Sequence, residues 1–478
     1  MFEKRQFGDL ARHWGIGAEV GPRFVSAAIL IAATLALPSV LAYGQTPYQA
    51  ARGNITFALT GDSIISRPLS AYVEPEFLAM VEAIRGADLA FTNLEIALQT
   101  VDKLTPMVSD RESYMFAHPS IAGELAWAGF DAVSRANNHA LDYGWDGMRA
   151  TSRALDDAGV AYAGVGENLA LADEAGYVQT GNGRVALIST ASSFDTFHPA
   201  RPQRPDIRAT PGLNPIRYHR TTTLAAAEFE ALKKIAQGLG RNVEDAAERF
   251  DFAGETFARG DETGVSTKAD PVDLQRILAS VDAAKRQSDW VIVATHTHES
   301  AASRELPADF LVEYARAAID AGADVFVGTG PHILRGIEIY KGRPIFYSLG
   351  NFFFENETVR YRPSAEYRGV DLPADSRTVD YYDDRQRTQG GYFTLDAWFW
   401  ETVVAMPRFE AGALEEIRLL PVTLGYDTPR ARRGRPMLAG SELGRKIIDD
   451  LARLSAPYGT EIRFEDGVGV VRTTPDAP

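Results

Sequence analysis

The sequence contains no cysteine, and histidine is scarce, with eight residues in a chain of 478. The absence of cysteine excludes disulfide bonds and thiolate metal sites, so a metal ion would have to be bound by His, Asp, Glu or Asn side chains. Basic residues are outnumbered by acidic residues, 49 against 64, which gives a formal charge of -15. This charge argues against nucleic acid as a partner, and an anionic substrate would need a local cation to bind.

The first 45 residues are predicted to be an export signal. A segment with several arginines ends at Arg23, and the uncharged stretch from Phe24 to Gly44 contains a long apolar run followed by small residues. This order is typical of a cleaved signal peptide, and the stretch is also long enough to serve as an uncleaved membrane anchor. Either interpretation places the body of the protein in the periplasm or outside the cell, free or held at the membrane by this segment.

Apolar runs typical of β-strands alternate with amphipathic helical stretches along the rest of the chain, which predicts a layered α/β fold. We expect one main domain over residues 54–425, followed by a C-terminal helix and tail over residues 426–478. The alternation of strand and helix patterns is interrupted at about residues 194–270. There a loop rich in Pro and Arg precedes a polar helix predicted from Leu224 to Arg249. This region is interpreted as a loop-helix insertion.

Polar residues with metal-binding side chains follow several of the predicted strands. They are Asp62, Asn93, Glu95, Asn138, His139, His296, His298 and His332. In open α/β sheets, ligands bind beyond the carboxyl ends of the strands, where the loops converge. This set of carboxylate, amide and imidazole groups suits Mn, Fe or Zn, and two such ions can activate a water molecule for hydrolysis.

Each of these residues also has an ordinary structural explanation. Asp62 can cap a turn, and Asn137 and Asn138 can cap a helix or occupy a left-handed position. His296 and His298 share one face of an extended strand and can form a satisfied pair in the core. The coincidence of so many such residues at strand ends favours the metal site.

Several motifs together resemble one known family. They are TGD (60–62), FTNLE (91–95), ANNHALDYG (136–144), THTHE (295–299) and GTGPHILRGIEIYKGRPIFYSLGNFFF (328–354). They look like the motifs of the CapA family of poly-γ-glutamate capsule biosynthesis proteins, in the metallophosphatase (calcineurin-like phosphoesterase) superfamily. The resemblance implies a four-layer αββα metallophosphatase-like sandwich with a centre of two divalent metal ions between its sheets. Two positions depart from the family pattern, since Ile64 and Thr329 stand where many relatives carry histidine.

The resemblance also implies roles for individual residues. The expected metal ligands are Asp62, Glu95, Asn138, His296, His298 and His332, with Glu95 as the acid that bridges the ions. The expected catalytic residues are His139, as the proton donor, and Asp142. The expected substrate-binding residues are Asn93, Asn137, Arg135, Glu299 and Asn351.

The functional hypothesis is an exported CapA-like protein that acts in the biosynthesis of poly-γ-glutamate or a related capsule polymer. It would hydrolyse a phosphoester, or an amide or ester of a polymer, with metal-activated water. The first alternative is a non-catalytic accessory protein that binds the polymer or stabilises subunits of a membrane synthase. The second alternative is a phosphoesterase that acts on small molecules.

Overall fold

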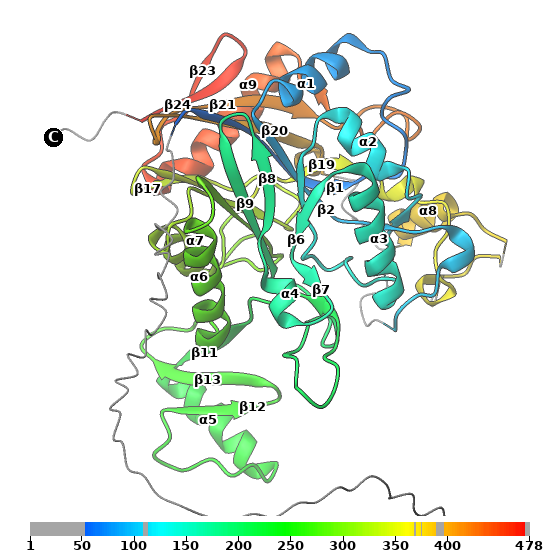
Figure 1. Cartoon of the computed structure of the whole chain (residues 1–478). Helices are drawn as coiled ribbons and strands as arrows, with labels where there is room; N and C mark the ends of the chain where they lie inside the picture. Colours follow the sequence, from blue (N-terminus) through cyan, green and yellow to red (C-terminus); the bar gives the residue numbers. More distant parts are fainter. Residues whose placement is uncertain (1–52, 109–112, 368–369, 374, 389–395, 474–478) are drawn as a thin grey trace, which may run out of the picture. The chain divides into compact units, whose positions relative to one another are not determined.

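A computed structural model of the chain describes residues 53–108, 113–367, 370–373, 375–388 and 396–473 (Figure 1). The predicted signal peptide or anchor lies outside the described residues. Within the described ranges, no helix is both long enough and apolar enough to cross a membrane. Two large β-sheets organise the α/β body.

The first sheet combines strands from the two ends of the described chain. Its strand order is β23-β24-β21-β20-β1-β2-β5-β6, with β19 paired to β1 and β22 paired to β21. The strands β1, β2, β5, β6 and β19 run parallel to their partners, whereas β20 is antiparallel to β1. The bounds are β1 (Ile55–Ile64), β2 (Leu89–Leu94), β5 (Ala132–Ser134), β6 (Ala161–Ala163), β19 (Asn351–Phe354), β20 (Glu401–Glu410), β21 (Ala413–Thr423), β22 (Met437–Leu438), β23 (Arg463–Glu465) and β24 (Val468–Arg472).

The second sheet is built from the middle of the chain, in the order β17-β18-β16-β15-β9-β8. Its central strands β9, β15 and β16 are parallel, so their carboxyl ends lie at one edge. The bounds are β8 (Gly176–Thr180), β9 (Gly183–Ala191), β15 (Trp290–His296), β16 (Val325–Thr329), β17 (Ile337–Tyr340) and β18 (Arg343–Phe346). Short strands outside both large sheets are β3 (Ala97–Leu98), β4 (Phe116–Ala117), β7 (Val165–Gly166) and β10 (Gly212–Leu213).

Alternating side chains of the buried strands build the layers. In β15, Trp290 and Ile292 pack into the core shared with the first sheet, where Trp290 meets Phe57 of β1 edge-on at 6.2 Å. Val291 and Val293 point to the opposite face, against helices. Successive strand residues face opposite sides of a sheet, so one apolar strand serves two cores.

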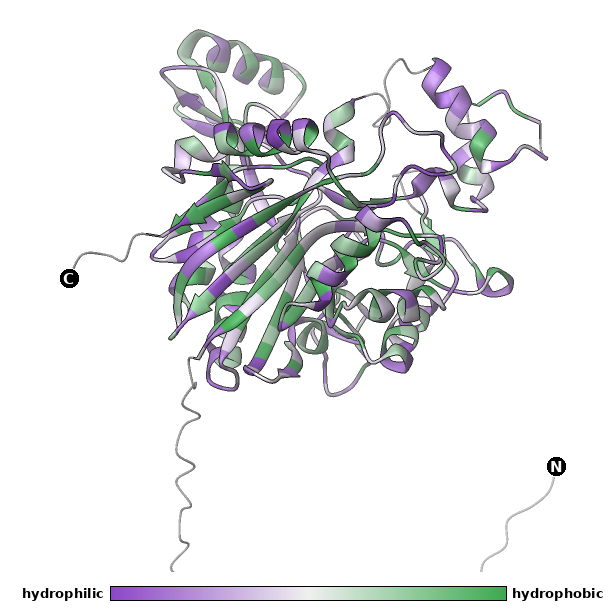
Figure 2. Cartoon of the chain, turned by 90° about the horizontal axis from the view of Figure 1, so that it is seen from above, coloured by the Kyte–Doolittle hydropathy of each residue, from purple (hydrophilic) through white to green (hydrophobic). Residues whose placement is uncertain are grey.

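Helices cover the outer face of each sheet, which confirms the predicted four-layer arrangement. The helices α1 (Pro75–Arg85), α2 (Ile121–Ala128) and α3 (Gly144–Ala158) pack on the first sheet, and α6 (Pro271–Lys285) and α7 (Asp309–Asp320) pack on the second. The remaining α-helices are α4 (Leu169–Asp173), α5 (Ala226–Gly238), α8 (Thr378–Thr388) and α9 (Ser441–Ser455). Viewed from above, the strands carry long hydrophobic stretches, and hydrophilic residues are frequent on the outlying helices (Figure 2).

The insertion differs from the expected loop and long helix. Its helix α5 ends at Gly238, and the strands β11 (Tyr218–Ala225), β12 (Arg249–Phe252), β13 (Glu255–Gly260) and β14 (Gly264–Ala269) form a sheet of their own in the order β12-β13-β11-β14. A small core around Phe229 and Phe250 joins this sheet to α5. The helix predicted from Leu224 to Arg249 is present only over Ala226–Gly238, and the strands around it were missed because they are polar and half-exposed and so lack an apolar run.

The C-terminal segment is more than a helix and a tail. Besides α9, it adds β22, β23 and β24 to the first sheet. The hairpin between β23 and β24 turns at Asp466 and Gly467, which both have positive φ, 48° and 87°. An Asp-Gly pair between two short alternating runs is a strong hairpin signal, and the prediction overlooked it.

Candidate metal centre

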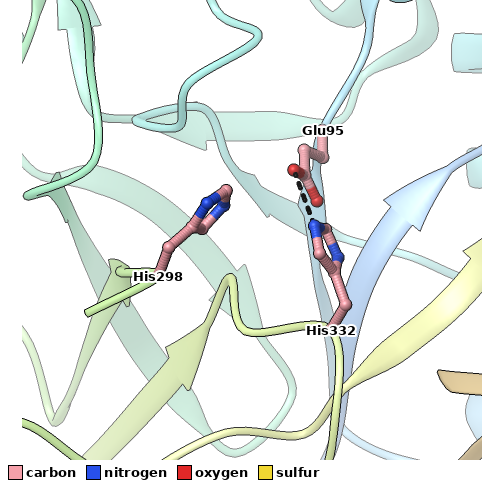
Figure 3. A group of neighbouring side chains, drawn as sticks. All are labelled: Glu95, His298 and His332. Carbon is pink, nitrogen blue, oxygen red and sulfur yellow. Dashed lines mark ion pairs between the residues drawn. The ribbon is translucent and has the colours of Figure 1, made fainter. Parts of the chain in front are cut away.

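The predicted metal ligands come from loops at the carboxyl ends of strands in both sheets. Asp62 lies near the end of β1 and Glu95 directly follows β2, whereas His296 ends β15 and His298 follows two residues later. His332 lies in the loop after β16 and approaches Glu95 from the opposite sheet, with His298 beside them (Figure 3). The two sheets therefore supply different ligands to one centre.

Glycine allows these loops to approach closely. A Cβ atom on Gly61 would lie 1.9 Å from the carbonyl oxygen of Gly350, so no other residue fits beside Asp62. Gly330 has a φ of 111°, and an added Cβ would lie 2.7 Å from the backbone nitrogen of Thr297. Close backbone approach at such positions requires glycine.

Two overlapping groups of side chains could hold a metal ion. One contains Asp62, Glu95 and His296, the other contains Glu95, His298 and His332, and in each group the ligand atoms lie within 4.8 Å of one another. Glu95 belongs to both groups, with its Oε1 3.6 Å from Nε2 of His296 and 3.8 Å from Nε2 of His332. Glu95 is therefore the carboxylate that the two candidate groups share.

Buried oxygen atoms without hydrogen bonds support this interpretation. Among the described residues, neither oxygen of Glu95 has a hydrogen-bond partner, and Oδ1 of Asn138 also has none. Burial, and then the negative charges of Asp62 and Asp142, raise the pKa of Glu95 well above its usual value. An unsatisfied buried carboxylate is costly, and a cation would provide the missing partner. The residues present therefore fit a bound metal.

The pKa values of two other predicted ligands, Asp62 and His332, also suit metal binding. Burial alone would raise the pKa of Asp62, but its hydrogen bond with His296 and the nearby imidazoles hold the pKa below its usual value. Burial lowers the pKa of His332 to about 4, so its imidazole is neutral at pH 7, which is the form that binds metal. His332 also has a φ of 63°, an uncommon conformation that is often found at functional sites.

His139 and Asp142 form a pair beside Glu95. Nδ1 of His139 lies 2.7 Å from Oδ2 of Asp142, and Nε2 lies 3.9 Å from Oε1 of Glu95. The backbone N–H of Met115 donates to the same Asp142 oxygen at 2.6 Å, which fixes the carboxylate. Because Asp142 holds one ring nitrogen, the other points at the centre, where it could transfer a proton.

The three asparagines expected to bind substrate contact predicted metal ligands or one another. Asn93 donates from Nδ2 to Oδ1 of Asp62 at 2.7 Å, and Asn137 donates from Nδ2 to Oδ1 of Asn93 at 3.1 Å. Oδ1 of Asn351 lies 2.9 Å from Nδ1 of His332. All three asparagines are fully buried, so their amides contact ligand residues and each other rather than an open cavity.

The structure does not bring the other two expected substrate residues into the ligand cluster. The carboxylate of Glu299 accepts hydrogen bonds from the hydroxyl groups of Ser192, Ser193 and Thr297. Arg135 is fully buried and its guanidinium turns toward α3. Of the two, Glu299 supports the loop that carries His298, and Arg135 faces another part of the molecule.

Two supporting residues were not predicted, and each ends a strand. Ser134 donates to Oδ1 of Asn93 at 2.6 Å, which turns the Nδ2 group of that amide toward Asp62. Oγ1 of Thr329 lies 3.1 Å from Nδ1 of His296. Thr329 therefore contacts a predicted ligand, at a position where relatives were expected to carry a histidine. Their positions, at the carboxyl ends of β5 and β16, were the signal that could have identified them.

A four-layer α/β sandwich with a buried Asp, Glu and His cluster at its strand ends defines the metallophosphatase-like class of fold. Within that class, residues 56–356 match the family described as "Bacterial capsule synthesis protein PGA_cap", and the chain belongs to this family. The expected membership in the CapA family is thereby confirmed.

Similar proteins include several with related names. "Uncharacterized protein y4sH" of Sinorhizobium fredii is 40% identical over 87% of this chain and 93% of its own length. "Capsule biosynthesis protein CapA" of Bacillus anthracis is 25% identical over 65% of this chain and 62% of its own length. "PGA biosynthesis protein CapA" of Bacillus subtilis is 28% identical over 62% of this chain and 58% of its own length.

Solved structures give only distant likenesses. A hypothetical protein from Thermus thermophilus is 14% identical, covers 80% of this chain and 96% of its own, and has a TM-score of 0.32. The NAD nucleotidase NadN of Haemophilus influenzae is 11% identical, covers 84% of this chain and 62% of its own, and has a TM-score of 0.28. At these values neither likeness bears on function.

Proposed function

We propose that this protein is a metal-dependent hydrolase that acts in the biosynthesis of poly-γ-glutamate or a related capsule polymer. The observation that carries the proposal is Glu95, a buried carboxylate shared by two ligand groups and without a hydrogen bond among the described residues. Membership in a capsule synthesis family and the similarity to proteins named CapA support the polymer as the context.

Two divalent ions, Mn, Fe or Zn, would occupy the centre. Asp62, Glu95 and His296 would hold the first ion, and Glu95, His298 and His332 would hold the second. The unpaired Oδ1 of Asn138 is a further ligand atom in the next loop. When bound, such ions lower the pKa of water and stabilise the negative charge of a hydrolytic transition state.

The chain's own residues would position the substrate bond and move a proton. His139, held by Asp142 at Nδ1, would donate a proton from Nε2 to the leaving group. Asn93 and Asn351 would keep Asp62 and His332 in their orientations. Because the whole chain is acidic, the ions would also supply the positive charge that an anionic polymer needs.

Export would place this chemistry where a capsule is assembled. The N-terminal 45 residues combine an Arg-containing segment with an apolar run, the pattern of a cleaved signal or an anchor. The proposed location is therefore the periplasm or the cell exterior. Detection of the intact N-terminal segment on the purified protein by mass spectrometry would distinguish an anchor from a cleaved signal.

The test is the metal content of the purified full chain, measured together with hydrolysis of phosphoesters and γ-glutamyl polymers. We expect about two equivalents of metal in the wild type. Asp142→Asn should keep this metal but slow turnover about a hundredfold, because His139 loses its orienting partner. A wild-type protein that binds no metal after reconstitution would contradict the proposal.

One observation favours a non-catalytic accessory role as the second candidate. Thr329 contacts His296 with a hydroxyl group where relatives were expected to carry a metal-binding histidine. Mycobacterial relatives that are 26% identical carry the name "Probable polyglutamine synthesis accessory protein". Polymer output in a deletion strain complemented with Glu95→Gln separates the two roles: preserved output without metal favours the accessory role, and lost output favours the hydrolase.

A further inference from the structure

A second pocket lies between α3, β6, β7 and α4, away from the ligand groups. It has a volume of about 540 Å³, and none of the predicted metal ligands lines it. The four elements lie side by side near the middle of the view in Figure 1. A cavity of this size is large enough for a small organic ligand.

A buried cation stands directly behind the wall of this pocket. Arg135 is only 1% exposed, and its guanidinium donates to Oγ of Ser152 at 3.1 Å and to the carbonyl oxygen of Met148 at 3.2 Å. Its central carbon also lies 5.8 Å from the ring centroid of Tyr162. Ser152, Met148 and Tyr162 all line the pocket. The guanidinium is therefore packed against the cavity, through three of its lining residues.

The charge of Arg135 is not neutralised by an ion pair. Among the described residues, no carboxylate lies within 4.0 Å of its guanidinium nitrogens. Burial lowers the pKa of Arg135 to about 10, so the side chain remains charged at neutral pH. Buried charges are normally paired, and here the attraction of Tyr162 and Asp156 only partly offsets the effect of burial on the pKa of Arg135. An anion in the pocket would compensate for this charge.

The lining contains hydrogen-bond donors for such an anion, and it also contains the carboxylates of Glu167 and Glu174. Ser152 accepts from Arg135, and its own proton has no acceptor among the described residues, so it can point into the pocket. Arg153 lines the rim, is exposed, and forms no ion pair within the described part of the chain. Arg149 is different, because Glu167 holds it with two hydrogen bonds of 2.7 Å and 2.6 Å.

We propose that this pocket binds a carboxylate, with Ser152 and Arg153 as its direct contacts and Arg135 as the cation behind them. The carboxylate would be that of a glutamate unit, either free or at the end of a polymer chain. The choice of glutamate rests on the proposed function, whereas the anionic character of the ligand rests on Arg135, Ser152 and Arg153. The role of the site would be to hold substrate or product apart from the metal centre.

The experiment is calorimetric titration of the full chain with three probes: L-glutamate, a short γ-linked oligoglutamate, and inorganic phosphate. Ser152→Ala and Arg153→Ala should each weaken carboxylate binding about tenfold, because each removes a hydrogen bond to a charged group. Arg241→Ala is the matched control, since Arg241 is also an exposed arginine with no ion pair among the described residues. It should bind as the wild type does.

Arg135→Met tests the buried cation itself. It should abolish binding and leave the melting temperature unchanged or higher, because an apolar side chain replaces an unpaired buried charge. A melting temperature that falls while binding persists would show a purely structural role and overturn the assignment of Arg135. If this variant does not fold, the Ser152 and Arg153 variants still decide the proposal.

The titrations distinguish free glutamate from a polymer end as the source of the carboxylate. They also distinguish the pocket from the metal centre as the binding site. Binding of both glutamate and the oligomer supports a free glutamate site, and binding of the oligomer alone supports a polymer end. Glu95→Gln should lose metal but keep carboxylate binding, so failure of the metal centre does not imply failure of the pocket. The proposal is overturned if Glu95→Gln abolishes carboxylate binding, if only phosphate binds, if the Ser152 and Arg153 variants bind normally, or if no probe binds at millimolar concentration.

Discussion

Glu95 and Glu355 are two buried glutamates at the carboxyl end of the same sheet, and they are satisfied in opposite ways. Glu355 follows β19 and receives the backbone N–H groups of Ser66 and Arg67 at 2.8 Å and 2.9 Å. It also forms an ion pair with the Arg67 guanidinium at 2.7 Å. Glu95 follows β2, is equally buried, and has no hydrogen bond among the described residues.

The difference separates a carboxylate that stabilises the fold from one that is available to a ligand. The chain supplies every partner that Glu355 needs, so its charge contributes to folding. Around Glu95 the chain places the Nε2 atoms of His296, His332 and His139 at 3.6, 3.8 and 3.9 Å, too far for hydrogen bonds. His296 and His332 are the two of these that belong to the candidate metal groups. Burial alone would not have distinguished the two residues, whereas their hydrogen-bond partners do.

The largest expected effect is on metal binding by Glu95→Gln. Because Glu95 belongs to both ligand groups, its loss should remove both ions and not just one. The metal-free variant should be at least as stable as the metal-free wild type, since a neutral amide replaces an unpaired buried carboxylate. Elemental analysis and thermal denaturation in a chelator measure the two effects. Retention of one full equivalent of metal would contradict the bridging role.

Glu355→Gln should give the reverse result. Loss of the ion pair with Arg67 should lower the free energy of unfolding by about 3 kcal/mol, because a buried pair is broken on one side. Denaturant titration measures this change. The folded fraction should retain the metal content of the wild type, and a parallel loss of metal would show that the two glutamates are not functionally distinct.

A smaller effect is expected from Asn351→Ala. Asn351 orients His332 through Nδ1, and loss of such a supporting hydrogen bond typically weakens metal affinity about tenfold. Competition with a chelator of known affinity measures the change. Asn356→Ala is the control, because Asn356 is a buried amide at the same edge whose side chain accepts from the backbone N–H of Glu357 and, among the described residues, bonds to no predicted ligand. Equal affinities in the two variants would argue against the orienting role.

The smallest effect concerns the pH dependence of stability without metal. Burial, and then nearby carboxylates, raise the pKa of Glu95 in the folded protein above its usual value of 4.5. The folded protein then binds this proton more tightly than the unfolded chain does, so stability is lost as pH rises above about 4.5. In a chelator, the melting temperature of the wild type should fall relative to Glu95→Gln over this range. Parallel curves would exclude an unfavourable buried charge at Glu95.

The sequence alone pointed to side chains that the structure brings together in the candidate metal groups. Histidines and carboxylates are rare at the ends of apolar strands, so Asp62, Glu95 and His296 could be identified individually. The residues that orient them could not be assigned, because Asn93 and Asn351 gain their roles only through contacts between distant strands. Local patterns contain no information about such partners.

The insertion and Arg135 show two other limits of sequence reasoning. The strands of the insertion are half-exposed and rich in threonine, so neither an apolar run nor a helical period marks them. Arg135 lies within a few residues of His139 in the same loop, yet its side chain turns toward α3. Neighbours in a sequence need not face the same site, and only the path of the backbone decides this.

The division of ligands between the two sheets has a consequence for the order of folding. Asp62 and Glu95 belong to the first sheet and the three histidines of the ligand groups to the second, and the first sheet also needs β20 and β21 from much later in the chain. Contacts between distant segments form slowly, because long loops must close first. The centre can therefore be complete only after both sheets have packed. Metal capture should then be the final event of folding, and the rate at which the sheets assemble should not depend on the metal.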